Sequence, residues 1–383
     1  KSNFNLAKRI TLLVAILILV VSLGLGLTSE INSSKALISQ TEDALLELSE
    51  EGVKHIEAVI EKELGILQEL ANRDRTKSMD WGTQSLSLKP DIERLGYLDM
   101  AVVTPDGQAK YILSGETADL GDRDYIKKAF EGEASVSDVI ISKVTNEPVV
   151  MYAAPIKQGS RIVGVLVGRR DGTVLSDITD TMGFGENGYA YIMGVDGTLY
   201  AHPDRENVIN QRNVLGDIET DGEFKKWGQA LEKLGIGNKG TVHYELLGSQ
   251  RYIGVVPMPS TGWIVGVGAF EEDVLGGLNT LKITIFISSI IFLVIGIIAA
   301  MFLGKSISAP IVELTGIIER FSNYDITIDE DSKAINYIKR KDEIGRISNA
   351  LLVMNKNLVN LVKDITDSAQ QVASSSEELT ATS

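Results

Sequence analysis

Residues 100–113 read MAVVTPDGQAKYIL and place an Asp-Gly turn between two apolar runs. Such a turn is typical of an antiparallel β-hairpin, so we expect strands at residues 100–103 and 111–113. The same pattern returns ninety positions later, where residues 189–201 read YAYIMGVDGTLYA. The repetition indicates two similar modules in tandem, each built on an antiparallel sheet.

A second pair of segments supports this internal repeat. Residues 153–156 read AAPI and residues 163–165 read VGV, and the chain has VVPM and VGV 102 positions later. Because two features recur in the same order, we predict an α+β fold with one module at about 73–182 and another at about 183–272. A chance similarity between hairpins is the alternative.

A long helix is predicted ahead of the first module. Apolar residues recur at helical spacing from Glu30 to about Asn72. They include Leu45, Leu48, Ile56, Ile60, Leu64 and Leu67.

The composition excludes several classes of function. The chain has 383 residues, which is room for two or three folded units. Its net charge of -15 would repel a polyanion, so nucleic-acid binding is disfavoured. It has no cysteine, which excludes disulfides, thiolate metal sites and cysteine nucleophiles.

Two uncharged runs determine the expected topology. Residues 10–27 and 282–303 are apolar enough to span a bilayer, apart from Lys282 at the edge of the second. A signal peptide and a buried core helix are the alternatives. Residues 1–9 and Lys305 supply positive charges outside the two runs, so we expect both ends in the cytoplasm. Residues 28–281 would then lie outside the cell membrane. The chain would cross this membrane twice, and the two spans would contact lipid.

The region after the second span has two helical patterns. Apolar residues at Ile307, Ile311 and Leu314 form one stripe, with Pro310 near its start. A second stripe begins at Ile344 and alternates by three and four. Its members are Ile344, Ile347, Leu351, Met354, Leu358, Leu361, Ile365, Ser368, Val372, Ser375 and Leu379. This seam predicts a coiled coil and therefore a homodimer, with a single surface helix as the alternative.

Three stretches of the predicted outer segment together resemble the double Cache sensor domain. They are GDRDYI at 121–126, the segment 137–145 with SDV and SKVT, and the segment from Gly188 to Pro203 with GYAYI, DGT and HP. The resemblance covers residues 30–275. It implies two PAS-like modules behind a long helix, with a small ligand held in the module farther from the membrane.

Arg123 and Tyr125 are the first candidates for binding that ligand. Arg123 precedes a predicted helix, and a guanidinium presents a planar fork that matches a carboxylate. In family members that bind amino acids, the matching positions are an arginine that holds the carboxylate and a tryptophan. The chain departs from that motif at Ala118 and Ile126, where aromatic residues are expected. The alternative is that Arg123 pairs with a neighbouring aspartate.

A larger departure occurs at Arg169. The family motif places an aspartate there for the ligand ammonium, so the sign of the charge is reversed. We therefore expect an organic acid rather than an amino acid, because an ammonium group would meet a repelling charge. In a strand, Arg169 and Asp171 share one face and Arg170 takes the other, so one arginine faces the pocket. Surface pairing of Arg169 with Asp171 is the alternative.

Other residues are weaker candidates. Tyr111 and Tyr152 can line the pocket, although strand tyrosines are more often packing residues. His202 is predicted to lie in a loop, without the clustered partners that a metal site requires. No recognisable catalytic constellation is present, so we expect neither an enzyme nor a cofactor.

The segment after the second span resembles two further families. Pro310, the two helical patterns and the Asp342-Glu343-x-Gly345 element resemble a HAMP linker over residues 304–357. Residues 358–383 resemble the start of a methyl-accepting chemotaxis signalling helix, in which Glu377 and Glu378 fit a methylation site. A plain polar coiled-coil face is the alternative for this glutamate pair.

The resemblance implies a transmembrane chemoreceptor. Its partners would be a cytoplasmic chemotaxis kinase and a coupling protein, which would bind beyond Ser383. We treat the chain as part of a longer protein, since it begins at Lys1 and stops within a helical pattern. The alternative function is the input half of a histidine kinase or diguanylate cyclase.

Overall fold

The computed structural model describes the backbone of residues 6–327, 332 and 334–382, and the side chains of these residues up to residue 377. The chain divides into two compact units. Residues 31–280 form the first, which we call the α/β unit. Residues 1–30 and 281–383 form the second, which we call the helical unit.

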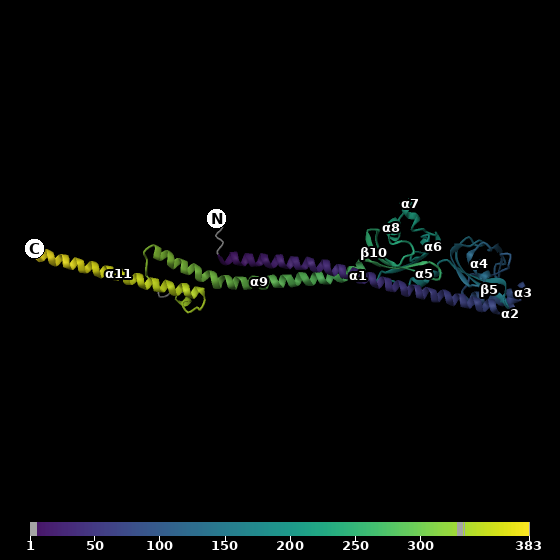
Figure 1. Cartoon of the computed structure of the whole chain (residues 1–383), viewed down its shortest axis with the longest axis horizontal. Coiled ribbons are helices and arrows are strands. Elements are labelled where there is room, and N and C mark those ends of the chain that lie inside the picture. Colours follow the sequence, from purple (N-terminus) through teal and green to yellow (C-terminus); the bar gives the residue numbers. More distant parts are fainter. Residues whose placement is uncertain (1–5, 328–331, 333, 383) are drawn as a thin grey trace. The chain divides into compact units, whose positions relative to one another are not determined.

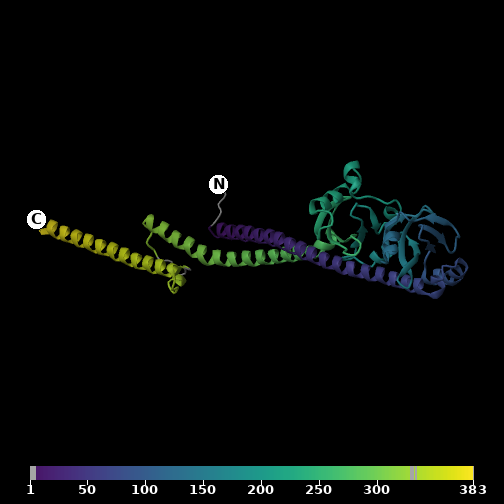
Figure 2. The same ribbon diagram turned by 45° about the vertical axis from the view of Figure 1, so that its right-hand side comes forward.

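A long helix, α1 (Leu6–Asn72), supports the whole α/β unit with its residues 31–72. Leu45, Ile56 and Leu67 on this segment are fully buried. They are spaced by three helical turns, so they lie on one face of the helix. Figures 1 and 2 both show this segment running along the two sheets of the unit. The predicted end of this helix at Asn72 is confirmed.

The first sheet is wholly antiparallel. Its strands are β1 (Asp99–Val103), β2 (Gln108–Tyr111), β3 (Thr117–Asp119), β4 (Ser135–Ile141), β5 (Pro148–Gln158) and β6 (Arg161–Asp171), in the order β3-β2-β1-β6-β5-β4. Three helices accompany it: α2 (Asp74–Lys77), α3 (Trp81–Leu95) and α4 (Asp124–Glu131). The predicted hairpin is present, but β2 covers residues 108–111 rather than 111–113.

The two faces of the first sheet pack against different helices. On one face, Tyr152 and Leu166 belong to a core that includes Leu67 of α1. On the other face, Met151 and Val167 belong to a core that includes Ile126 of α4. Alternate residues of a strand point to opposite faces of the sheet, so two consecutive residues pack in different cores. We call the two faces the α1 face and the α4 face.

The second sheet is also antiparallel and has five strands. They are β7 (Tyr189–Met193), β8 (Leu199–Ala201), β9 (Gly240–Leu246), β10 (Ser249–Pro257) and β11 (Ile264–Phe270), in the order β8-β7-β11-β10-β9. The connecting helices are α5 (Val174–Thr179), α6 (Arg205–Ile209), α7 (Gly216–Thr220) and α8 (Lys225–Leu234). This order matches β2-β1-β6-β5-β4 of the first sheet.

The register of the two sheets corrects one part of the predicted repeat. Ala153 pairs with Val167 in the first sheet, and Val255 pairs with Gly266 in the second. The two strand pairs therefore cannot share the offset of 102: if β5 and β10 correspond at 102, β6 and β11 correspond at 99. Under that correspondence the two VGV segments are not equivalent, because the two hairpins have loops of different length.

α1 lies close to the second sheet at Gly254 of β10. A Cβ atom at this position would lie 2.4 Å from the backbone of Leu45, so only glycine fits. Ser49 reinforces the contact, since its Oγ donates to the carbonyl of Gly254 at 2.8 Å.

The helical unit contains the remaining helices. They are the first part of α1, most of α9 (Glu271–Ser322), α10 (Ala334–Tyr337) and α11 (Glu343–Thr382). Both α1 and α9 are long and apolar enough, by length and composition, to cross a membrane. Glu30 and Lys282 form an ion pair of 2.8 Å between them.

Beyond the apolar part of α9, Leu314, Ala334 and Ile344 form a small core. Pro310 lies inside α9, and its missing N–H leaves the carbonyl of Ser306 without a helical partner. That carbonyl accepts a hydrogen bond of 3.2 Å from Arg340 Nη1. The segment just ahead of α11 is therefore bonded to α9 one turn before the proline.

Candidate functional site

Arg123 and Tyr125 are placed by the start of α4. Arg123 occupies the N-cap position with an extended backbone, and α4 begins at Asp124. The predicted helix boundary after Arg123 is therefore confirmed. Tyr125 is 5% exposed and packs in the core of the α4 face.

Arg169 lies on the same α4 face, near the end of β6. Arg169 is 6% exposed, and its Nε and Nη1 atoms have no hydrogen-bond partner among the described residues. The guanidinium carbon lies 5.0 Å from the centre of the Tyr111 ring, within the range of a cation–π contact. The ring compensates only part of the cost of a buried charge, so the two nitrogens remain available to an acceptor.

Arg123 and the two tyrosines complete the arrangement. Arg123 Nη2 is 3.4 Å from the carbonyl of Ile141, and its Nε is buried without a partner in the described part of the chain. The same holds for the hydroxyl of Tyr125. We call Arg123, Tyr125, Arg169 and Tyr111 the arginine site.

The tyrosine hydroxyls of the arginine site stay protonated. Burial raises the pKa of Tyr111, against the lowering effect of the nearby Arg169 and Arg123 charges. Burial also raises the pKa of Tyr125. The site therefore presents hydroxyl donors and guanidinium donors together, which suits an anionic acceptor.

Asp99 is a neighbour that the sequence did not identify. It is 1% exposed and pairs directly with Arg169 across β1 and β6. Its carboxylate accepts backbone N–H groups from Met100 at 2.8 Å, Leu113 at 2.9 Å and Ser114 at 3.2 Å. These bonds turn the chain after β2. Asp99 binds backbone groups about fourteen residues away in the chain, so no local sequence pattern predicts this role.

The adjacent Arg170 has a structural role on the α1 face. Its Nη2 donates to both carboxylate oxygens of Glu63 at 2.8 Å, and its guanidinium lies 4.4 Å from the ring centre of Tyr97. Arg169 and Arg170 therefore lie on opposite faces of the sheet, as strand alternation predicted, and the role of Arg169 in a ligand pocket stays a prediction.

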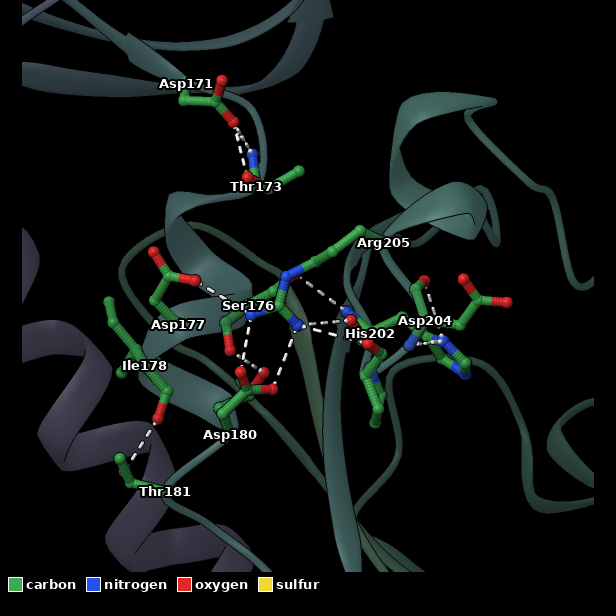
Figure 3. Close-up of polar contacts among 12 residues, drawn as sticks. Asp171, Thr173, Ser176, Asp177, Ile178, Asp180, Thr181, His202, Asp204 and Arg205 are labelled. Carbon is green, nitrogen blue, oxygen red and sulfur yellow. Dashed lines mark hydrogen bonds and ion pairs between the residues drawn. The ribbon is translucent and has the colours of Figure 1, made fainter.

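Two predicted site residues lie elsewhere. Tyr152 is a correction: it pairs with Gly168 on the α1 face and packs in the opposite core. Asp171 is exposed, and its carboxylate accepts bonds from the N–H and hydroxyl of Thr173 at 2.8 and 2.6 Å, as Figure 3 shows. It is a turn residue rather than part of the arginine site, and it does not pair with Arg169.

A groove runs beside α4, and Arg169 and Tyr111 are not among its lining residues. Its lining includes Arg123 and Tyr125, Ser135 and Asp138 of β4, and Trp263. Two residues of the arginine site therefore form part of the groove wall.

The remaining candidates have other roles. His202 follows β8, and its Nδ1 accepts the N–H of Asp204 at 3.0 Å. Burial lowers the pKa of His202. No group of three or more potential metal ligands occurs in the described residues. Glu377 is exposed on α11, and the side chain of Glu378 lies outside the described residues.

The sequence matches the model of one protein family. The model for the Cache domain matches residues 33–278. The methyl-accepting chemotaxis protein McpA of Bacillus subtilis is 28% identical over 262 residues, which are 68% of this chain and 36% of that protein. McpC of the same organism is 27% identical over 244 residues, which are 62% and 32%. The chain thus spans about a third of the length of these curated relatives.

Solved structures share the fold of the α/β unit. The ligand-binding domain of the Pseudomonas fluorescens chemoreceptor CtaA with L-leucine aligns with a TM-score of 0.51 at 16% identity. The alignment covers 63% of this chain and 99% of that one. The same domain with L-serine gives a TM-score of 0.50 at 15% identity, covering 61% and 99%.

Proposed function

The chain belongs to the Cache domain family, and from this premise we propose that it is the sensing and relay part of a transmembrane chemoreceptor. Its relatives are methyl-accepting chemotaxis proteins, which supports a receptor over the input half of a kinase or cyclase. The receptor binds a small organic anion at the arginine site of the first sheet.

The observation that carries this proposal is the state of Arg169. The guanidinium of a residue that is only 6% exposed, with two nitrogens lacking partners among the described residues, is costly unless an anion binds it. A carboxylate matches the fork of an arginine and makes two parallel bonds. Arg123 and the Tyr125 hydroxyl add further donors, and these two residues line the groove beside α4.

An amino acid is the second candidate ligand. The CtaA domain is solved with L-leucine and with L-serine, and Asp99 lies opposite Arg169 on the same face. Asp99 could take the ammonium group that the aspartate of the family motif would otherwise hold. Against this, three backbone N–H groups already use its carboxylate, and Arg169 would repel an ammonium group.

A thermal-shift panel on the full chain in nanodiscs tests the two ligands against each other. The panel contains acetate, pyruvate, succinate, citrate and the common amino acids. The proposal expects stabilisation by one or more of the organic acids, and its loss in Arg169→Met. Stabilisation only by amino acids, kept in Arg169→Met and lost in Asp99→Asn, would overturn it in favour of the second candidate.

We extend the proposal to the layout of the whole chain. Residues 28–281 form a double Cache domain, with modules at about 73–182 and 183–272, outside the membrane. Residues 10–27 and 282–303 span the membrane, residues 304–357 form a HAMP linker, and residues 358–383 begin the signalling helix. The matching strand order of the two sheets and the two long apolar helices support this layout.

The proposed partners follow from the same layout. Several apolar residues of α11 are exposed in the single chain, including Leu361, Ile365 and Val372. A second copy would cover this seam as a coiled-coil dimer. Glu377 and Glu378 are the proposed methylation sites, and a cytoplasmic kinase and coupling protein would read the signal. Incubation of the full chain with a chemotaxis methyltransferase and labelled S-adenosylmethionine tests the glutamates, which should lose the label in a double glutamine variant.

A further inference from the structure

The strand that carries Arg169 continues into the short helix α5. β6 ends at Asp171 and α5 begins at Val174, so only two residues lie between them. This turn is closed by the bonds from Thr173 to the Asp171 carboxylate and by the N–H of Gly172, which donates to the carbonyl of Pro148 at 3.0 Å. So short a connection cannot absorb a shift of the strand end, and such a shift reaches α5.

Arg205, at the start of α6, holds α5 on its other side. Its Nη2 donates to Asp177 at 2.9 Å and to Asp180 at 2.6 Å, and its Nη1 donates to the second oxygen of Asp180 at 3.0 Å. Nη1 also donates to the carbonyl of His202 at 3.0 Å. Figure 3 shows the guanidinium lying between the acidic residues of α5 and His202.

A buried hydroxyl gives α5 a second anchor at the same place. Ser176 is fully buried, and its Oγ accepts the N–H of His202 at 3.2 Å. His202 directly follows β8, an edge strand of the second sheet. The end of β8 is therefore bonded to α5 by both its N–H and, through Arg205, its carbonyl.

We propose that Arg205 is a positioning residue that couples the arginine site to the second sheet, by making residues 199–209 move with the end of β6. This inference rests on the proposed function, in which a ligand on Arg169 shifts the position of the end of β6. It adds the route by which that shift leaves the first sheet.

Two other contacts between the sheets define the competing route. Trp263 Nε1 donates to Asp138 at 2.6 Å, and Gln211 Nε2 donates to the carbonyl of Val139 at 3.1 Å. Both reach β4, which is separated from β6 by β5. One strand separates β4 from Arg169, but β4 contacts Arg123 through the carbonyl of Ile141, so the experiment must distinguish the two routes.

Hydrogen exchange on the full chain in nanodiscs, without any ligand, tests the coupling. Arg169→Met removes the buried charge at the end of β6 and serves as the perturbation. With Arg205 present, it should slow exchange in both α5 and residues 199–209, by about two- to fivefold. In an Arg205→Ala background, the effect on residues 199–209 should vanish while the effect on the end of β6 remains.

Three further variants separate coupling from a general loss of structure. Asp180→Asn removes one carboxylate charge from the Arg205 contact and should weaken the effect, whereas Arg205→Lys should keep part of it. Lys226→Ala breaks an exposed ion pair between α8 and Glu245 of β9 and should leave the effect unchanged. If Arg205→Ala prevents folding, the comparison of Arg205→Lys with Asp180→Asn provides the same readout.

Two results would overturn the inference. One is no response of residues 199–209 to Arg169→Met in the parent chain, and the other is an unchanged response without Arg205. Because no ligand is used, neither result bears on whether an anion binds, and a failed ligand panel does not alter this test.

Discussion

Arg169 and Asp99 are direct partners in the register of β6 and β1, yet their side chains do not bond to each other. The Asp99 carboxylate accepts three backbone N–H groups, while Arg169 Nε and Nη1 have no partner among residues with described side chains. A cation and an anion on the same face would normally pair, so their separation leaves the arginine available to a ligand.

Replacing Arg169 by methionine should stabilise the ligand-free protein. A methionine fills a similar volume without the cost of a buried charge, so the free energy of unfolding should rise by about 1–2 kcal/mol. Denaturant unfolding of the full chain in detergent measures it. Arg161→Met, at the exposed start of the same strand, is the matched control and should change stability by less than about 0.5 kcal/mol.

The neighbouring substitution Arg170→Met should have the opposite effect. It removes the cation that pairs with Glu63, whose side chain is 13% exposed, and leaves this carboxylate with only the hydrogen bond from the Tyr97 hydroxyl. We expect a loss of about 3 kcal/mol in the same unfolding experiment. The double variant Glu63→Gln with Arg170→Met should recover part of the loss, and purely additive losses would contradict the paired role.

Tyr125→Phe separates binding from stability. The hydroxyl has no partner in the described part of the chain, so its removal should change the unfolding free energy by less than about 0.5 kcal/mol. If it donates to the ligand, affinity for an organic acid identified by the panel should fall about tenfold in a calorimetric titration. Unchanged affinity would exclude this hydroxyl from the site.

His202 should make the junction between the sheets sensitive to acid. Burial lowers its pKa, with the charges of Arg251 and Arg205 acting in the same direction and Asp204 opposing. The unfolded chain then takes up the proton first, so stability is full above about pH 6.5 and falls as the pH drops toward the folded pKa. Protonation of Nδ1 would also remove the acceptor for the Asp204 N–H.

Unfolding of the parent and His202→Gln between pH 8 and pH 5 measures this effect. The parent should lose more stability across the window than the variant. Identical pH profiles would contradict the assignment.

Local patterns in the sequence predicted much of the fold and part of the site. Helical spacing predicted the end of α1, and the position of Arg123 ahead of Asp124 predicted the start of α4. Strand alternation predicted that Arg169 and Arg170 point to opposite faces, which their contacts confirm.

Features that depend on pairing between strands could not be predicted from spacing alone. Tyr152 and Arg169 lie on different strands, so their relative faces follow from a register that the sequence does not encode locally. The same reason explains Asp99, whose neighbours come from β6 and from the turn after β2. The unequal offsets of the two hairpins arise likewise, because their loops differ in length.

The most direct test of the account is a calorimetric titration of the full chain with the organic acid that stabilises it most in the panel. The account predicts binding that weakens about 100-fold in Arg169→Met and stays unchanged in Arg161→Met. Equal affinity in the parent and Arg169→Met would contradict the central claim that Arg169 holds the ligand.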